Sequence, residues 1–487
     1  MPYLKVNTSI NEIGIDKLLR CNYRTTIYKN DVLNIRKKYD STIRLKSIFN
    51  IISGYAFSSK DYVEEGIPIV RIGDLNNYSL NYENMIKVPQ EYYEEDKYKN
   101  YIVKKDDILV SLTGDGNLKC LYYNDNKELL LNQRVAILRA KSNINIEFYY
   151  WLLKSDFVKK QFAYYSNGKS QLNISPFDLA NINIPVIDEK LQSLCMEKIS
   201  PTISEVKNLS SKIKQINEII NKVFAEKFNY DENLINSIRK GMTYGTQSST
   251  NTSMNIFNTR FNTLNNLRLS VRANSPIFNK IDDILRQTNT TIMKNIVKEN
   301  IHNGAKPDYI DTGIPVVKTA YLSNNGINTE EIQEYTTIDS YKNNVNAQLR
   351  RNDILICNIG KCSCGKIDIK EDEIKAFGAN EVTIIRVDEK KYNPRFLLYF
   401  LRSIFGISQI EKAYTGTTNQ IHLNPQNVEK FLVPEILLEE QKKIVDIVET
   451  KIYEQRKIEK QIAIKQMKIE EILSKIIWIL YIKLFNN

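Results

Sequence analysis

Three cysteines and two histidines would have the most distinctive chemistry if they met at one site. Cys357, Cys362 and Cys364 cluster near one predicted turn, and thiolates are good zinc ligands. Their spacing, Cys-x4-Cys-x-Cys, lacks the Cys-x2-Cys pair of structural zinc sites, and no fourth ligand is evident. His302 and His422 are the only histidines, too few for histidine-based acid–base chemistry. We therefore expect no metal site.

The sequence also lacks the motifs of enzymes that act on DNA. A DNA amino-methyltransferase holds its flipped base on a Pro-Pro turn followed by an aromatic residue, and Asn173–Phe177 has a single proline. Residues 360–365 contain two glycines interrupted by cysteines, which is not a Gly-rich nucleotide loop. Asp107 and Asp353 lack a correctly spaced Glu-x-Lys of a nuclease, so we interpret both as turn residues at a strand entrance. We expect no catalytic residue.

Polar side chains that could contact DNA recur in loops and at strand ends. The loop that begins at Gly168 and the one that begins at Gly416 offer donors to phosphates and base edges. A cation or amide at a strand end can do the same, although ordinary polar turns and solvated charges are the simpler interpretation. The sequence contains an internal repeat, in which Glu381 of the second copy corresponds to Arg134 of the first. This difference suggests that the two copies do not read the same DNA bases. The candidate DNA-binding residues are Arg71, Gln133, Arg134, Lys169, Ser170, Gln171, Lys318, Thr417, Thr418, Asn419 and Gln420.

An internal repeat with a period of about 247 to 249 residues positions these candidates twice. Gly66–Arg71 returns as Gly313–Lys318, and the Asp-Ile-Leu of Asp107 returns at Asp353. Further matches follow in the same order: Val135–Arg139 with Val382–Arg386, Gly168 with Gly416, Gln171 with Gln420, Ile184-Pro185 with Val433-Pro434, and Gln192 with Gln441. Chance cannot order so many matches at one spacing.

Each copy is predicted to be a globular α+β unit with mixed sheets, followed by a long helix. Short β-branched or aliphatic runs bounded by Gly, Asp or Asn predict the strands. In the first copy these are 67–72, 108–112 and 134–138, and in the second copy they are near 316, 354–357 and 382–387. Helical spacing predicts one helix at 148–164 and one at 396–410.

The residues from Glu189 to Phe228 predict one uninterrupted helix with a narrow apolar stripe, and a similar stretch runs from Leu437 to Leu480. Such a stripe needs one long partner, so we expect the two helices to form an antiparallel coiled coil. The predicted seam is Ile199, Ile203, Val206, Ile213, Ile216, Ile220, Ile444, Val448, Ile452, Ile458, Ile462, Ile469 and Ile472.

The predicted boundaries are a globular domain at 1–187, a spacer helix at 188–230, a linker at 231–258, a second domain at 259–436 and a second spacer helix at 437–487. The linker is placed by its Ser, Thr and Asn content. Two domain-plus-helix copies in antiparallel arrangement give one chain an internal pseudo-twofold symmetry. On a duplex, such a molecule would read two short patches at a fixed separation.

Composition favours a nucleic-acid partner. The chain has 487 residues and a formal net charge of +11, which suggests an acidic partner, nucleic acid first and anionic membrane second. Six cysteines without a disulfide framework, together with no recognisable signal segment, predict a cytoplasmic protein. The longest apolar run, near Ile476 to Ile482, is far shorter than a membrane span, so no membrane partner is expected.

The chain resembles the specificity subunit of Type I restriction-modification systems over nearly its whole length. The resemblance lies in the repeated sequence stretches, the doubled layout and the Asn132–Arg139 run. The resemblance implies two target-recognition domains that read a bipartite DNA target, and helices that set the gap and dock two methyltransferase subunits. Restriction/translocase subunits would then join. It also implies that this chain has no cofactor, with SAM, and ATP with Mg, used by the partners for adenine-N6 methylation and translocation. A repeated leader (Arg20 and Arg24; Arg268 and Arg272) also resembles subunits of Type IIB-like systems, which leaves the system type open.

Two other classes compete with this interpretation. A self-sufficient DNA methyltransferase or nuclease would bind SAM or a metal as an isolated chain. A coiled-coil scaffold for proteins would show no salt-dependent affinity for DNA in any complex.

Overall fold

The computed structural model describes residues 42–485 except 64, 76–79, 81, 83–84, 115–118, 167–171, 231–275, 323–325, 361–364 and 417–420. These residues divide into two compact units. The first-head unit contains 42–213 and 457–485, and the second-head unit contains 214–230 and 276–456. We call residues 42–187 and 276–436 the first and second heads. The predicted linker and the leader arginines lie outside the described residues.

The first head is built on an antiparallel four-stranded sheet with the order β2-β9-β5-β7. Its strands are β2 (Phe49–Ser53), β5 (Asp107–Ser111), β7 (Cys120–Tyr123) and β9 (Val135–Ala140). Successive side chains of a strand point to opposite faces. Ile108 and Val110 therefore join the core under the helices, whereas Leu109 joins the core on the other face. Both faces are buried, which explains why β5 is a continuous apolar run.

A smaller sheet, β4-β3-β8, covers the second face. Its strands are β3 (Ile67–Val70), β4 (Lys87–Val88) and β8 (Leu130–Leu131). β3 pairs antiparallel with β4 and parallel with β8, so this sheet is mixed as predicted. Two short ladders complete the head, β1 (Thr42–Arg44) with β11 (Asn183–Pro185) and β6 (Thr113–Gly114) with β10 (Leu172–Asn173).

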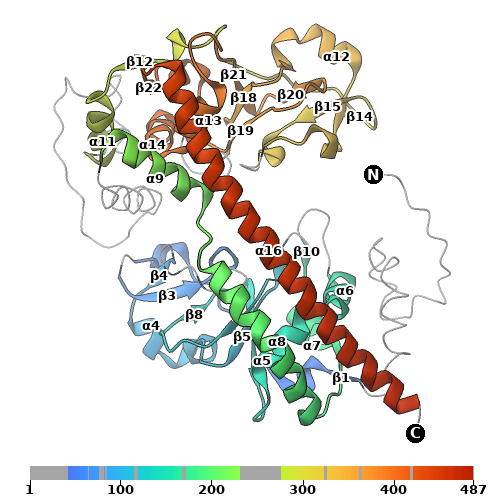
Figure 1. The fold of residues 1–487 in the computed structure, drawn as a ribbon. Coiled ribbons are helices and arrows are strands. Elements are labelled where there is room, and N and C mark those ends of the chain that lie inside the picture. Colours follow the sequence, from blue (N-terminus) through green and yellow to red (C-terminus); the bar gives the residue numbers. More distant parts are fainter. Residues whose placement is uncertain are drawn as a thin grey trace. The chain divides into compact units, whose positions relative to one another are not determined.

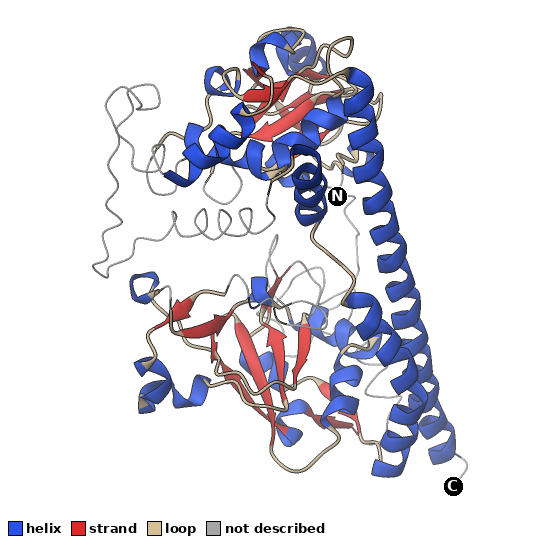
Figure 2. Cartoon of the chain, turned by 60° about the vertical axis from the view of Figure 1, so that its left-hand side comes forward, coloured by secondary structure: helices blue, strands red, loops and turns tan. Residues whose placement is uncertain are grey.

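The second head repeats this plan. Its four-stranded sheet has the order β13-β21-β18-β19, and its five-stranded sheet has the order β14-β16-β15-β20-β17, in which β15 and β20 run parallel. Figure 2 shows the strands of each head gathered together, with helices at their side. The strands are β12 (Thr290–Ile292), β13 (His302–Asn303), β14 (Tyr309–Ile310), β15 (Ile314–Val317), β16 (Tyr335–Thr336), β17 (Gln348–Leu349), β18 (Ile354–Cys357), β19 (Ile367–Ile369), β20 (Ala376–Gly378), β21 (Val382–Ile385) and β22 (Leu432–Pro434).

Both heads break the helix that the sequence predicted as one. The first head has α5 (Ile146–Leu153) and α6 (Asp156–Tyr165), and the second has α13 (Pro394–Arg402) and α14 (Ile404–Ala413). An extended serine stands at each break, Ser155 or Ser403. Its hydroxyl donates to the carbonyl of the residue three positions earlier, at 2.6 Å in both heads. Because serine competes for backbone hydrogen bonds in this way, the same residue ends the helix twice.

The predicted uninterrupted helix from Glu189 to Phe228 is wrong. It is two helices, α8 (Glu189–Ser210) and α9 (Ile216–Phe228), separated by 211–215. The Ser211 hydroxyl donates to the Asn208 carbonyl, and Gln215 with Glu218 forms a capping box that starts α9. The C-terminal helix, α16 (Leu438–Phe485), is continuous. No described helix is long and apolar enough to cross a membrane.

In the second-head unit, α9 packs against α13 and α14 and against the first part of α16 (Figure 1). Lys227, at the end of α9, pairs with Glu440, whereas the Lys214 amide before α9 donates to Gln455 at 2.8 Å. Contacts that run in opposite directions along the two segments define an antiparallel pair. The predicted seam residues in this core are Ile216, Ile220, Ile444, Val448 and Ile452.

In the first-head unit, α8 packs with the later part of α16, and Glu205 pairs with Lys465. Of the seam residues here, Ile199, Ile203, Val206, Ile462 and Ile469 are buried. Ile458 is half-buried, and Ile472 packs at the edge of the core. The assignment of Ile213 to the seam is wrong, because it lies in the break between helices and is 37% exposed.

Candidate nucleic-acid interface

The backbone of the first head brings together strand-end candidates that are far apart in the sequence. The Asn132 amide donates to the Val70 carbonyl at 3.0 Å, and the Gln133 amide donates to the Tyr55 carbonyl at 3.0 Å. Arg71, which follows Val70, therefore lies at the same edge of the head as Gln133. We call this edge the first rim; it consists of Arg71, Lys119, Gln133 and Arg134. Lys119 belongs to it because its Nζ donates to the carbonyl of Ile72, the residue after Arg71, at 3.2 Å. Gln133 and Arg134 are exposed.

A row of hydrogen bonds leads from Arg134 through Leu112 to Ile174. The Leu112 amide donates to the Arg134 carbonyl, and the Ile174 amide donates to the Leu112 carbonyl, both at 2.9 Å. Ile174 follows closely after the predicted loop residues in the sequence. Those residues, Lys169, Ser170, Gln171, Thr417, Thr418, Asn419 and Gln420, lie outside the described residues, and their DNA contacts stay a prediction.

The second head has an equivalent edge with different side chains. The Ala379 amide donates to the Val317 carbonyl at 2.9 Å, as Asn132 does to Val70. The row also recurs: the Asn358 amide donates to the Glu381 carbonyl at 3.0 Å, and the Leu423 amide donates to the Asn358 carbonyl at 2.9 Å. We call this edge the second rim; it consists of Lys318, Glu334, Asn380 and Glu381.

The cations that end the first strand of each head, Arg71 and Lys318, are both paired with carboxylates. Arg71 Nε lies 3.2 Å from Asp74 Oδ2, and Lys318 pairs with Glu334. Burial disfavours the charged form of Lys318, but Glu334 outweighs burial and raises its pKa. These pairs partly neutralise the two cations, so any contact with phosphate would compete with an internal partner. Arg134, on the same edge as Arg71, is exposed.

Glu381 is fixed by the backbone of the second rim. Its Oε1 accepts a hydrogen bond from the Thr319 amide at 3.1 Å. In the first head, the carboxylate at the corresponding turn belongs to the turn itself: Asp74 Oδ2 accepts a hydrogen bond from the Arg71 amide at 2.9 Å. The two rims thus share a backbone frame and differ in where their carboxylates stand.

Asp107 and Asp353 take part in a contact that sequence reasoning missed. As predicted, each closes a turn at a strand entrance, accepting from the amide of Lys104 at 2.7 Å or Arg350 at 2.8 Å. Each also forms a two-pronged ion pair with an arginine, Arg139 near the end of β9 or Arg386 directly after β21. Arg139 and Arg386 lie 2.7 Å from the aspartate Oδ2 through Nη2 and 2.8 Å from Oδ1 through Nε. The recurrence of both partners at one repeat spacing was the signal in the sequence.

Cys357 is buried in the second head beside the second rim. Its Sγ lies 3.0 Å from Thr319 Oγ1 and donates to the Ile359 carbonyl at 3.2 Å. Burial raises the pKa of the thiol, which keeps it protonated. Cys362 and Cys364 lie outside the described residues, and within the described part no group of three or more His, Cys, Asp or Glu residues could hold a metal ion. The absence of a metal site stays a prediction.

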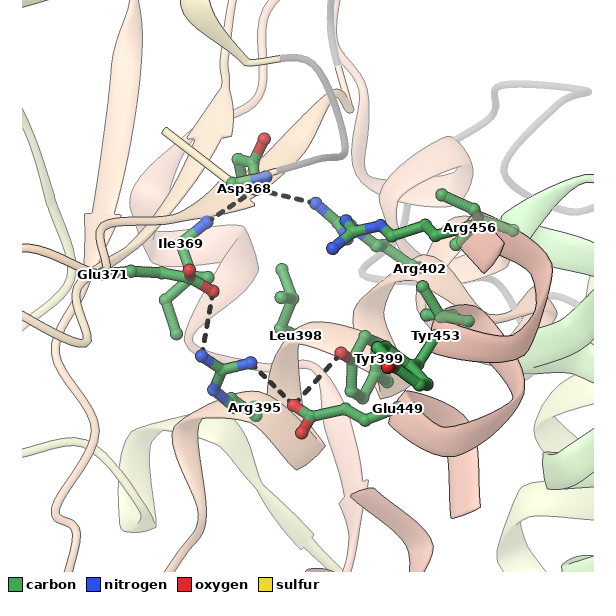
Figure 3. Close-up of a pocket in the computed structure, with 13 residues that line it drawn as sticks. Asp368, Ile369, Glu371, Arg395, Leu398, Tyr399, Arg402, Glu449, Tyr453 and Arg456 are labelled. Atoms are coloured by element: carbon green, nitrogen blue, oxygen red, sulfur yellow. Dashed lines mark hydrogen bonds and ion pairs between the residues drawn. The ribbon is translucent and has the colours of Figure 1, made fainter. Parts of the chain in front are cut away.

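A pocket of about 310 Å³ in the second-head unit is lined by charged side chains of α13, β19 and α16 (Figure 3). Arg395 of α13 contacts Glu371 at 3.0 Å and Glu449 of α16 at 2.6 Å. The Tyr399 hydroxyl lies 3.4 Å from the same Glu449 oxygen. These contacts join the head to the helix, which gives the pocket a structural role.

Two heads built on one plan, each with a polar rim at equivalent strand ends, define a duplicated recognition protein. A model of the family described as Type I restriction modification DNA specificity domain matches residues 37–223 and again residues 278–468. The chain therefore belongs to this family, and its function is DNA target recognition.

The chain is similar in sequence to specificity subunits of Type I restriction enzymes. The chain is 24% identical over 448 residues to the EcoBI specificity subunit of Escherichia coli, covering 89% of this chain and 83% of that protein. It is 26% identical over 197 residues to the MjaVIII specificity subunit of Methanocaldococcus jannaschii, covering 39% and 42%. A solved S subunit from M. genitalium matches with a TM-score of 0.35 and 14% identity, covering 90% of this chain and 95% of that one.

Proposed function

We propose that this chain is a non-catalytic specificity subunit that directs methyltransferase and restriction subunits to a bipartite DNA target. The observation that carries the proposal is the double match of the family model, one match for each head. Each head brings a rim that mixes charged and amide side chains, the groups that reach phosphates and base edges.

The proposed partners are double-stranded DNA, two methyltransferase subunits and the restriction/translocase subunits. The chain itself would carry no cofactor, while SAM, ATP and Mg would be bound by the partners. In this proposal the two heads are the target-recognition domains, each reading one part of the target. The helices α8, α9 and α16 form antiparallel coiled-coil spacers that set the gap between the two parts.

Co-expression with the methyltransferase encoded beside it tests the function. In a host that lacks adenine methylation, we expect N6-methyladenine within a two-part motif, two short defined sequences separated by a fixed number of unspecified bases. Long-read sequencing of the genomic DNA measures the motif and its occupancy. The methyltransferase alone is the control and should leave the motif unmethylated.

Methylation at one continuous motif, or the same methylation without this chain, would contradict the proposal. SAM binding by the isolated chain would instead support a self-sufficient methyltransferase.

A further inference from the structure

The two rims carry opposite charges at one equivalent position. The Arg134 carbonyl accepts from Leu112, and the Glu381 carbonyl accepts from Asn358, at 2.9 and 3.0 Å. Each row then continues to a residue, Ile174 or Leu423, that follows a predicted DNA-binding loop. The backbones of Arg134 and Glu381 therefore occupy equivalent positions in the two heads, and the two residues differ in the charge of their side chains.

The first rim presents donors at this place. Arg134 is exposed, and it neighbours the exposed amide of Gln133. Its own amide donates to Asn132 Oδ1 at 3.3 Å, which helps to define the turn. Arg71 is engaged with Asp74 at 3.2 Å, and Lys119 Nζ donates to the Ile72 carbonyl at 3.2 Å, which leaves Arg134 as the cation of the rim best placed to meet a new partner. A guanidinium has five N–H donors in a planar fork and matches the O6 and N7 acceptors of guanine.

The second rim presents an acceptor. Glu381 is half-buried, and the Thr319 amide holds its Oε1 at 3.1 Å. A carboxylate has two oxygens and about four lone-pair sites, so the hydrogen bond from the Thr319 amide positions the group and does not by itself saturate it. The nearby Lys318 forms its ion pair with Glu334, whose Oε2 lies 3.3 Å from the Tyr321 hydroxyl, and Glu381 adds a weaker electrostatic attraction to Lys318. The rim therefore offers a fixed acceptor, which suits the N4 amino group of cytosine.

We infer that Arg134 and Glu381 are specificity-determining residues of opposite kind. Arg134 donates to a guanine in one part of the target, and Glu381 accepts from the amino group of a cytosine in the other part. The inference rests on the proposed function, because it requires each head to read its own part of the target.

Two single substitutions in the methyltransferase complex test the assignment. Arg134→Gln removes the charged fork, and Glu381→Gln keeps the size of the side chain and an oxygen for the Thr319 amide while adding donors. Each variant should relax one G·C position in one part of the motif, with discrimination reduced about tenfold to a hundredfold, and leave the other part unchanged. Lys119→Gln is the matched control on the first rim; it should reduce overall methylation without changing any base of the motif.

The readout is the methylated motif from genomic sequencing, with a thermal unfolding curve to verify that each variant is folded. A two-part wild-type motif whose bases stay the same in both variants would overturn the assignment and leave the proposed function standing. The assignment would also be overturned if both variants lost base discrimination in the same part of the motif. A wild-type complex with no two-part motif would overturn the proposed function, and the assignment with it.

Discussion

Replacing Asp353 with alanine is expected to lower the free energy of unfolding of the second head by about 3–5 kcal/mol, because it leaves a buried arginine without its partner. Asp353 is fully buried, and the side chain of Arg386 is 8% exposed. Glu299 also pairs with Arg386, but it is itself partly exposed, so it compensates only in part. Hydrogen exchange of peptides from β18 and β21 measures the change, because Asp353 directly precedes β18 and Arg386 directly follows β21.

The first head provides the matched control. Asp107→Ala breaks the same two-pronged contact, but the Arg139 side chain is 24% exposed and can regain water, so we expect a smaller loss. The double variant Asp353→Ala with Arg386→Met should lose less than Asp353→Ala alone, since no charge is then stranded. A change below about 1 kcal/mol for Asp353→Ala would show that the pair does not hold the strands together.

Replacing Phe224 with alanine should destabilise the second-head unit by about 3–5 kcal/mol through the cavity that it creates. Phe224 lies on α9, is fully buried, and has its ring centroid 5.7 Å from that of Phe396 and 6.2 Å from that of Phe400. The prediction follows from a finding that the repeat did not suggest: α9, which follows the first head in the sequence, belongs to the core of the second head. Hydrogen exchange of α13 is the readout.

Ile213→Ala tests the same point from the other side. As an exposed residue between α8 and α9, Ile213 should change stability by no more than about 0.5 kcal/mol. If Ile213→Ala costs as much as Phe224→Ala, an uninterrupted apolar seam is the better description of this region.

The strands were predictable because their residues are both β-branched or aliphatic and repeated. β18 begins and ends at the predicted residues, and β3, β5, β9, β15 and β21 differ by a few residues at their ends. The pairing order was not predictable, because a strand buried on both faces has no alternation to fix its neighbours. The parallel pairing of β3 with β8 joins residues that are roughly 60 positions apart in the sequence, and no local sequence pattern predicts such a contact.

The helix breaks at Ser155, Ser403 and 211–215 were missed because apolar spacing continues through them. Periodicity reports which face is apolar, and it does not report whether the backbone hydrogen bonds continue. The serines and the Gln215–Glu218 capping box are the sequence signals of these helix ends, and apolar spacing does not record them.

For the candidate interface, the sequence identified residues and the structure supplied their neighbours. Arg71, Gln133 and Arg134 were selected separately, and the hydrogen bonds of Asn132 and Gln133 place them on one edge. The pairing of Arg71 with Asp74, three residues away, could have been anticipated from local spacing. The pairing of Lys318 with Glu334 could not, since it joins two strand ends through the fold.

Lengthening the helices tests the central claim most directly. Four residues inserted in α16 after Arg456 add about one helical turn of 5.4 Å, and four more between Ser211 and Gln215 let the segment between α8 and α9 lengthen with it. At about 3.4 Å per base pair, the unspecified gap of the methylated motif should grow by roughly one to two base pairs, while the bases of both parts stay the same. A gap that stays unchanged in a folded, active complex would contradict the account.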